Sequence, residues 1–219
     1  MDRDTLYQQL AQIGHAASSP HRLRLLNLLG QGEKSVEQLA TAIGQSVAAT
    51  SAHLKVLRSV CLVETRKEGR NVFYRVAAEE MAPFWVALRR LGERVLPEVR
   101  EVVRTYYSDP DSLAELSGRE LIDQVRQGRV TLLDLRPAPE FAAGHLPGAR
   151  SVPAGELEEW MHRLPKRKPL VAYCRGPYCV TALESVRRMR DAGLNVRRLP
   201  LGIVEWRAAG LPVEPAATK

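Results

Sequence analysis

Apolar residues recur at helical spacing in the first third of the chain. Leucine and isoleucine side chains repeat every three or four positions over residues 3–15, which predicts an amphipathic helix there. A second helix is expected to begin at Ser19-Pro20, because serine favours the N-cap and proline the first helical position. It should end near Gly30, where the leucine repeat stops.

Two shorter helices and a hairpin are predicted next. The first helix covers Val36–Ile43 and stops at Gly44; the second is capped by Ser46 and runs to about Ser59. Two short helices joined by a tight turn with glycine are typical of a helix-turn-helix. Residues 62–66 and 72–75 then alternate apolar and polar side chains around a glycine turn, which predicts a β-hairpin with a basic tip.

A long apolar seam follows over residues 79–107. Its apolar side chains are spaced by alternating steps of four and three, interrupted only at Gly92, and they are Met81, Trp85, Leu88, Val95, Val99, Val102 and Tyr106. A seam of this length favours association with another helix. Pro97 lies inside it and lacks a backbone N–H, so a kink or break is expected there.

The pattern changes after the segment Ser108–Ser112, which has the composition of a linker. A capping box at Ser117 predicts a helix to about Gln127. Buried strands are expected over 130–135, 170–173 and 195–199, with helices over 180–192 and 203–209. Strands that alternate with helices indicate an α/β fold with a central parallel sheet.

The chain is therefore predicted to hold two domains of different class. Residues 1–107 form a mainly-α, winged helix-turn-helix domain for DNA binding and dimerisation, and residues 108–116 are a linker. Residues 117–219 form the α/β domain.

Charge and cysteine content narrow the location and the partners. A formal net charge of +7 suits contact with a polyanion such as DNA. No apolar run approaches the length of a membrane span, and the N-terminus lacks the pattern of a signal peptide. We therefore expect a cytoplasmic protein with no membrane contact. Three cysteines in such a chain argue against a disulfide framework and favour redox or metal chemistry for the close pair Cys174 and Cys179.

The first half resembles the ArsR family of winged helix-turn-helix regulators. The matching residues are Pro20, Arg22-Leu23, Leu39-Ala40, Ser51, His53-Leu54-Lys55-Val56-Leu57, Glu68-Gly69-Arg70 and Tyr74. The resemblance implies a homodimer, held through the 79–107 helix, that binds a near-palindromic double-stranded operator and usually represses transcription.

A recognition helix that begins at Ser46 would place its first turns in a major groove. Side chains there and on the hairpin are candidates for hydrogen bonds to bases or for neutralising phosphates. They are Thr50, Ser51, His53, Lys55, Arg58, Arg66, Lys67 and Arg70. His53 has a second interpretation, as a residue that only packs or caps locally. Because Val47, Ala48 and Ala52 are apolar where the family often has polar residues, contacts to thymine methyl groups and DNA shape are expected to matter more.

Neither metal site common in this family is expected here. The helix before the recognition helix has no cysteine, and residues 79–107 contain no histidine or cysteine. Cys61 stands alone and is expected to be buried. The sequence predicts no bound metal and no cofactor.

The second half, from about Ser117 to Glu214, resembles a single-domain rhodanese. The matching segments are Asp134-x-Arg136, Glu140-Phe141, Gly144-His145-x-Pro147-Gly148-Ala149 and Trp206-Arg207-x-Ala209-Gly210-Leu211-Pro212-Val213. The loop from Cys174 to Cys179 lies where such domains keep their active cysteine. Of these residues, Trp206 is expected in the core, and Asp134, Arg136, Glu140 and His145 are given structural roles, as a strand-end ion pair and a turn hydrogen bond.

The loop suggests sulfur chemistry at Cys174. This residue follows a strand and precedes a helix, so backbone N–H groups are expected to lower its pKa and favour the thiolate. A sulfane-sulfur donor or small oxidant would react there, and Arg175 would hold an anionic donor. Cys179 could then attack the modified Cys174 to form a disulfide or polysulfide; alternatively it is a small packing residue at a helix start.

The sequence is compatible with three hypotheses about function. The first is a DNA-binding regulator, by family a repressor, that responds to reactive sulfur species or oxidants through Cys174. The second is a sulfurtransferase that forms a Cys174 persulfide, with the DNA-binding half providing localisation or autoregulation. The third is a rhodanese domain that has lost its chemistry and serves as a dimer contact.

Overall fold

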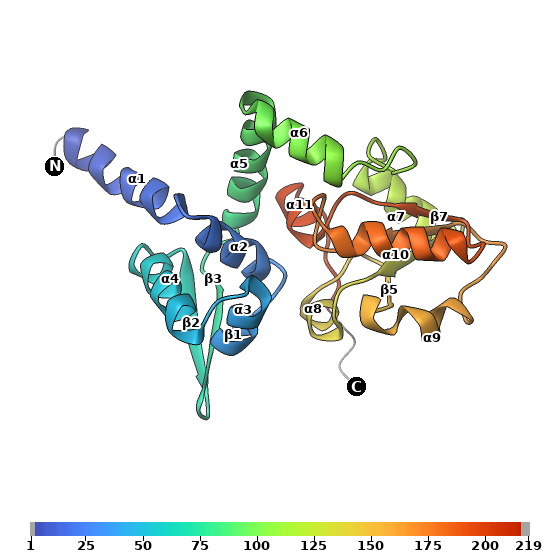
Figure 1. Ribbon diagram of the computed structural model, residues 1–219, viewed down its shortest axis with the longest axis horizontal. Coiled ribbons are helices and arrows are strands. Elements are labelled where there is room, and N and C mark those ends of the chain that lie inside the picture. Colours follow the sequence, from blue (N-terminus) through green and yellow to red (C-terminus); the bar gives the residue numbers. More distant parts are fainter. Residues whose placement is uncertain (1–2, 216–219) are drawn as a thin grey trace. The chain divides into compact units, whose positions relative to one another are not determined.

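The computed structural model describes residues 3–215, and the chain divides into two compact units, Met1–Met81 and Ala82–Lys219. Figure 1 shows the helices and strands of both units. Residues 82–107 group with the α/β unit in this division. The predicted domain boundaries at residues 107 and 117 therefore stay predictions, and they do not coincide with the division between the compact units at residues 81 and 82.

The first unit is a helix-turn-helix with a β-hairpin wing. Its helices are α1 (Arg3–Ala17), α2 (Pro20–Leu29), α3 (Val36–Ile43) and α4 (Val47–Ser59). Its strands are β1 (Lys34–Ser35), β2 (Val63–Glu68) and β3 (Asn71–Val76), paired antiparallel in the order β1-β3-β2. The predicted helices and hairpin are confirmed. The two-residue strand β1 was not predicted, because so short a segment carries no alternation.

Local capping explains where α3 and α4 begin and end. Ser35 and Gln38 form a reciprocal capping box at the start of α3. Gly44 ends α3 with a φ of +69°, a conformation that glycine adopts at little cost. Ser46 then accepts a hydrogen bond from the Ala49 N–H and starts α4. The helices pack through fully buried leucines: Leu25, Leu39, Leu54 and Leu57.

The second unit is a parallel sheet with helices around it. Its helices are α5 (Met81–Val95), α6 (Pro97–Tyr106), α7 (Gly118–Arg126), α8 (Ala138–Ala143), α9 (Leu157–Met161), α10 (Val180–Asp191) and α11 (Ile203–Ala208), with a 3-10 turn η1 (Ala154–Glu156). Its strands are β4 (Thr131–Asp134), β5 (Arg150–Ser151), β6 (Leu170–Tyr173) and β7 (Val196–Arg198), all parallel in the order β5-β4-β6-β7. The α/β fold with a central parallel sheet is confirmed, and β5, α8 and α9 are additions to it.

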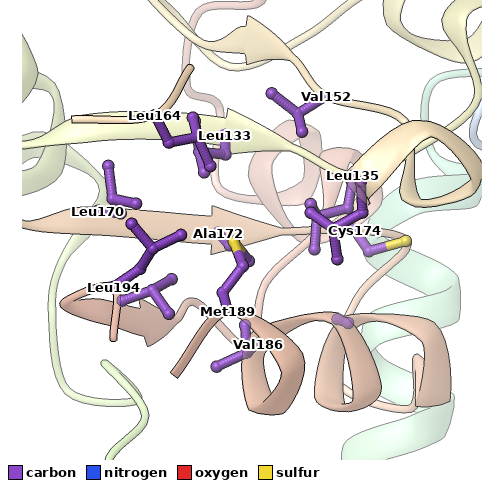
Figure 2. Close-up of a cluster of buried hydrophobic side chains, with 13 residues drawn as sticks. Leu133, Leu135, Val152, Leu164, Leu170, Ala172, Cys174, Val186, Met189 and Leu194 are labelled. Carbon is purple, nitrogen blue, oxygen red and sulfur yellow. The ribbon is translucent and has the colours of Figure 1, made fainter. Parts of the chain in front are cut away.

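Strand side chains alternate between two apolar cores, one on each face of the sheet. Leu133 and Ala172 belong to one core, which Figure 2 shows together with Val186 and Met189. Leu132 and Val171 belong to the other core, which surrounds the fully buried Trp206. Because successive strand residues point to opposite faces, a strand buried on both faces reads as a continuous apolar run.

The long seam is broken at Pro97, as its chemistry requires. α5 ends at Val95, Leu96 is extended (φ −105°, ψ 108°), and α6 starts at Pro97. The two parts of the seam lie in different surroundings, one packed against the core and one exposed to solvent. Trp85 on α5 packs against the Trp206 core, whereas Val102 and Tyr106 on α6 are exposed. The exposed part, which begins with Val95 at the end of α5, is available to another partner.

Candidate functional site

The exposed side chains at the start of α4, which would face the major groove of DNA, are mostly apolar. Val47 is 46% exposed, and Ala48 and Ala52 are also exposed. Thr50 is fully buried, and its hydroxyl donates to the Ser46 carbonyl at 2.9 Å. The prediction that Thr50 contacts DNA is therefore corrected: the β-branched side chain points into the fold and supports the helix start.

The remaining candidates on α4 lie at or near the surface. Lys55 and Arg58 are exposed, and Ser51 is half-buried. His53 stacks on His21 with ring centroids 5.2 Å apart. Burial and the neighbouring positive groups lower the pKa of His53, so its neutral form is favoured. This contact matches the interpretation of His53 as a locally packed residue.

The wing carries three basic residues in different electrostatic settings. Arg66 donates to Glu33 (Nε–Oε1 3.0 Å) and to Glu68 (Nη1–Oε2 2.7 Å), so its charge is largely compensated. Lys67 and Arg70 are exposed near the turn between β2 and β3. We therefore expect Lys67 and Arg70 to contribute more to phosphate binding than Arg66.

The cysteine loop lies between β6 and α10, at the carboxyl edge of the parallel sheet. Figure 2 shows Cys174 at the end of the buried cluster, just beyond the strand β6 that carries Ala172. Gly176 has a φ of +116°, and a Cβ there would lie 2.9 Å from a carboxylate oxygen of Glu205. A Cβ on Gly202 would lie 2.6 Å from the Gly176 nitrogen. Both glycines are thus needed for the backbone to pass so closely, which the sequence did not indicate.

Cys174 and Cys179 form a hydrogen-bonded pair of free cysteines. A hydrogen bond from the Cys174 thiol lowers the pKa of Cys179 to about 6, with help from the backbone N–H groups of Arg175 and Ala182 and against the effect of burial. The same bond and burial raise the pKa of Cys174 well above its ordinary value. The expected lowering of the Cys174 pKa is thus wrong for the reduced pair, because Cys174 is 4% exposed and its neighbour holds the negative charge.

A proton shared between two sulfurs belongs to the pair rather than to one residue. One thiolate is available near neutral pH, and the second sulfur lies within reach of it. The arrangement can therefore take up a sulfur or oxygen atom on one cysteine and close a disulfide with the other.

Arg175 is less free than the sequence suggested. Its Nε and Nη2 donate to the carboxylate of Glu140 at 3.0 and 2.6 Å. Glu140 is 3% exposed, so the pair is held inside the domain. That Arg175 holds an anionic sulfur donor stays a prediction. To do so, its guanidinium would have to leave Glu140 or bind Glu140 and the donor together.

Other residues of the rhodanese-like motifs have structural roles. Arg136 and Asp134 form a fully buried ion pair (Nη2–Oδ2 2.6 Å), and the Tyr173 hydroxyl also donates to Asp134. His145 stacks on Phe141. These contacts confirm the strand-end ion pair.

Residues 3–215 show neither a metal cluster nor a membrane-spanning helix. No group of three or more His, Cys, Asp or Glu side chains there is arranged to hold a metal ion. In the same range, no helix has the length and apolar character needed to cross a membrane. Cys61 is exposed with a φ of +56°, which corrects the expectation that it is buried.

Comparison with known proteins identifies both halves. Residues 19–65 match the family model "Bacterial regulatory protein, arsR family", and residues 117–209 match "Rhodanese-like domain". A curated relative, the HTH-type transcriptional regulator Rv0324 of Mycobacterium tuberculosis, is 41% identical over 212 residues, which covers 97% of this chain and 93% of the relative. The chain is an ArsR-family transcriptional regulator with a rhodanese-like domain.

Other similarities cover the DNA-binding half of this ArsR-family regulator. The SmtB homologue of Synechocystis sp., named a transcriptional repressor, is 44% identical over 70 residues, 32% of this chain and 53% of that protein. A solved domain of Mb0332 from Mycobacterium bovis is described as a homodimeric winged helix-turn-helix DNA-binding domain. It is 38% identical, covers 45% of this chain and 92% of that domain, and has a TM-score of 0.42.

Proposed function

We propose that this ArsR-family regulator represses transcription from an operator and is switched by reactive sulfur species or oxidants at its cysteine pair. The observation that carries the proposal is the pair of free cysteines Cys174 and Cys179, whose hydrogen bond lowers the pKa of Cys179, in the same chain as a DNA-binding unit. Cytoplasmic action and the absence of membrane contact stay predictions of the sequence.

Operator binding rests on α4 and the wing. The exposed cations Lys55, Arg58, Lys67 and Arg70 supply phosphate contacts, and the apolar surface at Val47 suits thymine methyl groups. Ser51 and His53 remain candidates for contacts to bases or phosphates, in a supporting role.

A second copy of the chain is the proposed partner of α6. Large apolar side chains on α5, α6 and the break between them are about half exposed or more: Leu91, Val95, Leu96, Val102 and Tyr106. The 38% identical Mycobacterium bovis domain is described as homodimeric. A homodimer through the 79–107 segment would cover this surface and place two recognition helices on a two-fold operator.

The two cysteines can react with a hydropersulfide or with hydrogen peroxide, and neither reaction needs a cofactor. The thiolate of the pair attacks the outer sulfur of a hydropersulfide RSSH, which forms a cysteine persulfide and releases RSH after protonation. The second thiol attacks the inner sulfur of that persulfide, forms the Cys174–Cys179 disulfide and releases H₂S. With hydrogen peroxide, the thiolate forms a sulfenic acid and water, and the second thiol displaces another water to give the same disulfide.

The test is an operator titration with DNA upstream of the protein's own gene, at fixed salt, before and after treatment with a persulfide donor. Mass spectrometry of the peptide that holds Cys174 and Cys179 reports sulfur uptake and disulfide formation. We expect operator binding to weaken as the Cys174–Cys179 disulfide forms, a step that needs both cysteines. Cys174→Ser should bind the operator as wild type does but lose the response, whereas the exposed control Cys61→Ser should keep it.

Two results would contradict the proposal. A response that survives in Cys174→Ser would place the sensor elsewhere. Sulfur uptake with unchanged operator affinity would instead favour a sulfurtransferase that forms a persulfide on this loop, and turnover with a thiol acceptor would then establish it.

A further inference from the structure

The second half of the cysteine loop is attached to α5 and α6, and Tyr178 makes most of the contacts. Its hydroxyl donates to the carboxylate of Glu93. The guanidinium of Arg89 lies over its ring, 5.5 Å from the centroid. The ring of Tyr107, at the end of α6, packs against it with centroids 5.3 Å apart. Tyr178 thus touches both helices, and Cys179 is the next residue along the chain.

Arg198 ties the loop backbone to the end of α6. Its Nη1 donates to the Pro177 carbonyl at 3.1 Å, and its Nη2 donates to the Tyr107 carbonyl at 2.8 Å. Arg198 is 3% exposed, and Asp109 lies 3.8 Å from its Nε. One buried guanidinium therefore holds the loop and the helix end together.

The other side of the loop reaches α5 through Glu205. Glu205 lies against Gly176 and accepts a hydrogen bond from the Gly202 N–H at 2.9 Å. Its carboxylate is 3.9 Å from the Arg89 guanidinium, which also binds Glu93 at 2.7 Å. Arg89 and Glu93, one turn apart on α5, therefore meet the loop directly at Tyr178 and indirectly through Glu205 of α11.

We propose that Tyr178 transmits the chemical state of the Cys174–Cys179 pair to α5 and α6. This inference rests on the proposed function, since it names the route by which that same site regulates DNA binding. A disulfide brings the two sulfurs to about 2 Å, closer than a thiol–thiolate hydrogen bond allows. The four residues between them must adjust, and Tyr178 is the one of these whose side chain contacts both helices.

The surroundings of Tyr178 suit two arrangements of its ring. A groove of about 490 Å³ borders Tyr178, Tyr107 and Arg198 and gives the ring space to leave its contacts. Burial and the hydrogen bond to Glu93 raise the pKa of Tyr178 to about 12, so the hydroxyl remains a donor at physiological pH. Loss of this donor–acceptor contact on disulfide formation would loosen the attachment of the loop to α5, and α5 and α6 carry the proposed dimer surface.

The test compares wild type with Tyr178→Phe and Glu93→Gln in the full-length protein. Tyr178→Phe keeps the ring and removes the hydroxyl; Glu93→Gln keeps the size of the acceptor and removes its charge. Glu98→Gln makes the same change on the exposed face of α6 and is the matched control. Operator affinity and thiol products are measured in parallel, before and after a persulfide donor.

We expect the donor to weaken wild-type and Glu98→Gln binding by about fivefold or more, within the usual range of coupling between sites. Tyr178→Phe and Glu93→Gln should form the same thiol products but change operator affinity by about twofold or less. A full response in Tyr178→Phe would overturn the inference. So would a cysteine pair that no longer reacts in that variant, because Tyr178 would then only position the thiols. If wild type itself does not respond, it is the proposed function that fails.

Discussion

Cys179 should react as a thiolate well below the pH at which an ordinary cysteine does. Its pKa of about 6, against an ordinary value of 9.0, is a shift of three units. At about 1.36 kcal/mol per unit, this corresponds to roughly 4 kcal/mol in favour of the thiolate. At pH 7 about 90% of the molecules would carry the thiolate, against about 1% for an unshifted thiol.

The perturbation that tests this reasoning is Cys174→Ala. The hydrogen bond from Cys174 is the largest cause of the low pKa of Cys179, and alanine has no donor. The pKa should rise by at least about one unit, though not to the ordinary value, because the N–H groups of Arg175 and Ala182 remain. Cys174→Ser keeps an O–H donor and should give a smaller rise, which makes it the matched control.

The assay is the rate of iodoacetamide alkylation at Cys179 as a function of pH, resolved by mass spectrometry of the loop peptide. Only the thiolate reacts, so the rate rises with pH through the pKa of the residue. We expect a midpoint near 6 in wild type and a higher one in Cys174→Ala. A wild-type midpoint above about 8, or equal midpoints in the two proteins, would refute the account of a shared thiolate.

Three further outcomes test other parts of the molecule. Asp134→Ala leaves the fully buried Arg136 without its ion-pair partner. In a denaturant titration it should lower the free energy of unfolding of the second unit by about 3–5 kcal/mol. A loss no greater than that caused by Asp191→Ala, at an exposed position, would contradict the buried-charge argument. Arg70→Ala should reduce the salt slope of operator binding by about 0.9 if Arg70 neutralises one phosphate, and an unchanged slope would remove it from the interface. Val102→Asp should convert the dimer to monomer in analytical ultracentrifugation, whereas a monomeric wild type would contradict the proposed partner.

Much of the secondary structure could be predicted because its signals are local. Ser35, Ser46 and Ser117 cap helices through groups three residues away, so the sequence alone locates those helix starts. Pro97 likewise breaks its helix through its own missing N–H. Alternation around a glycine turn predicted the wing for the same reason.

The residues of the candidate site could be named from the sequence, but the pKa of each cysteine could not. The loop from Cys174 to Cys179 was identified from the resemblance to a rhodanese, with its place between a strand and a helix as support. The hydrogen bond between the two sulfurs lowers the pKa of Cys179 and raises that of Cys174, which is also the more buried of the two, and the sequence does not show this contact. Thr50 was assigned to DNA from its position on the recognition helix, but the rotation of that helix against the core buries it.

The sequence by itself determined the two fold classes and the positions of the longer helices and strands, because capping, periodicity and turn chemistry act within a few residues. Only the tertiary structure decided the contacts of the loop. Glu140 binds Arg175 across 35 residues and Glu93 binds Tyr178 across 85. Such pairs form when the chain folds and buries them together, and no local pattern records them.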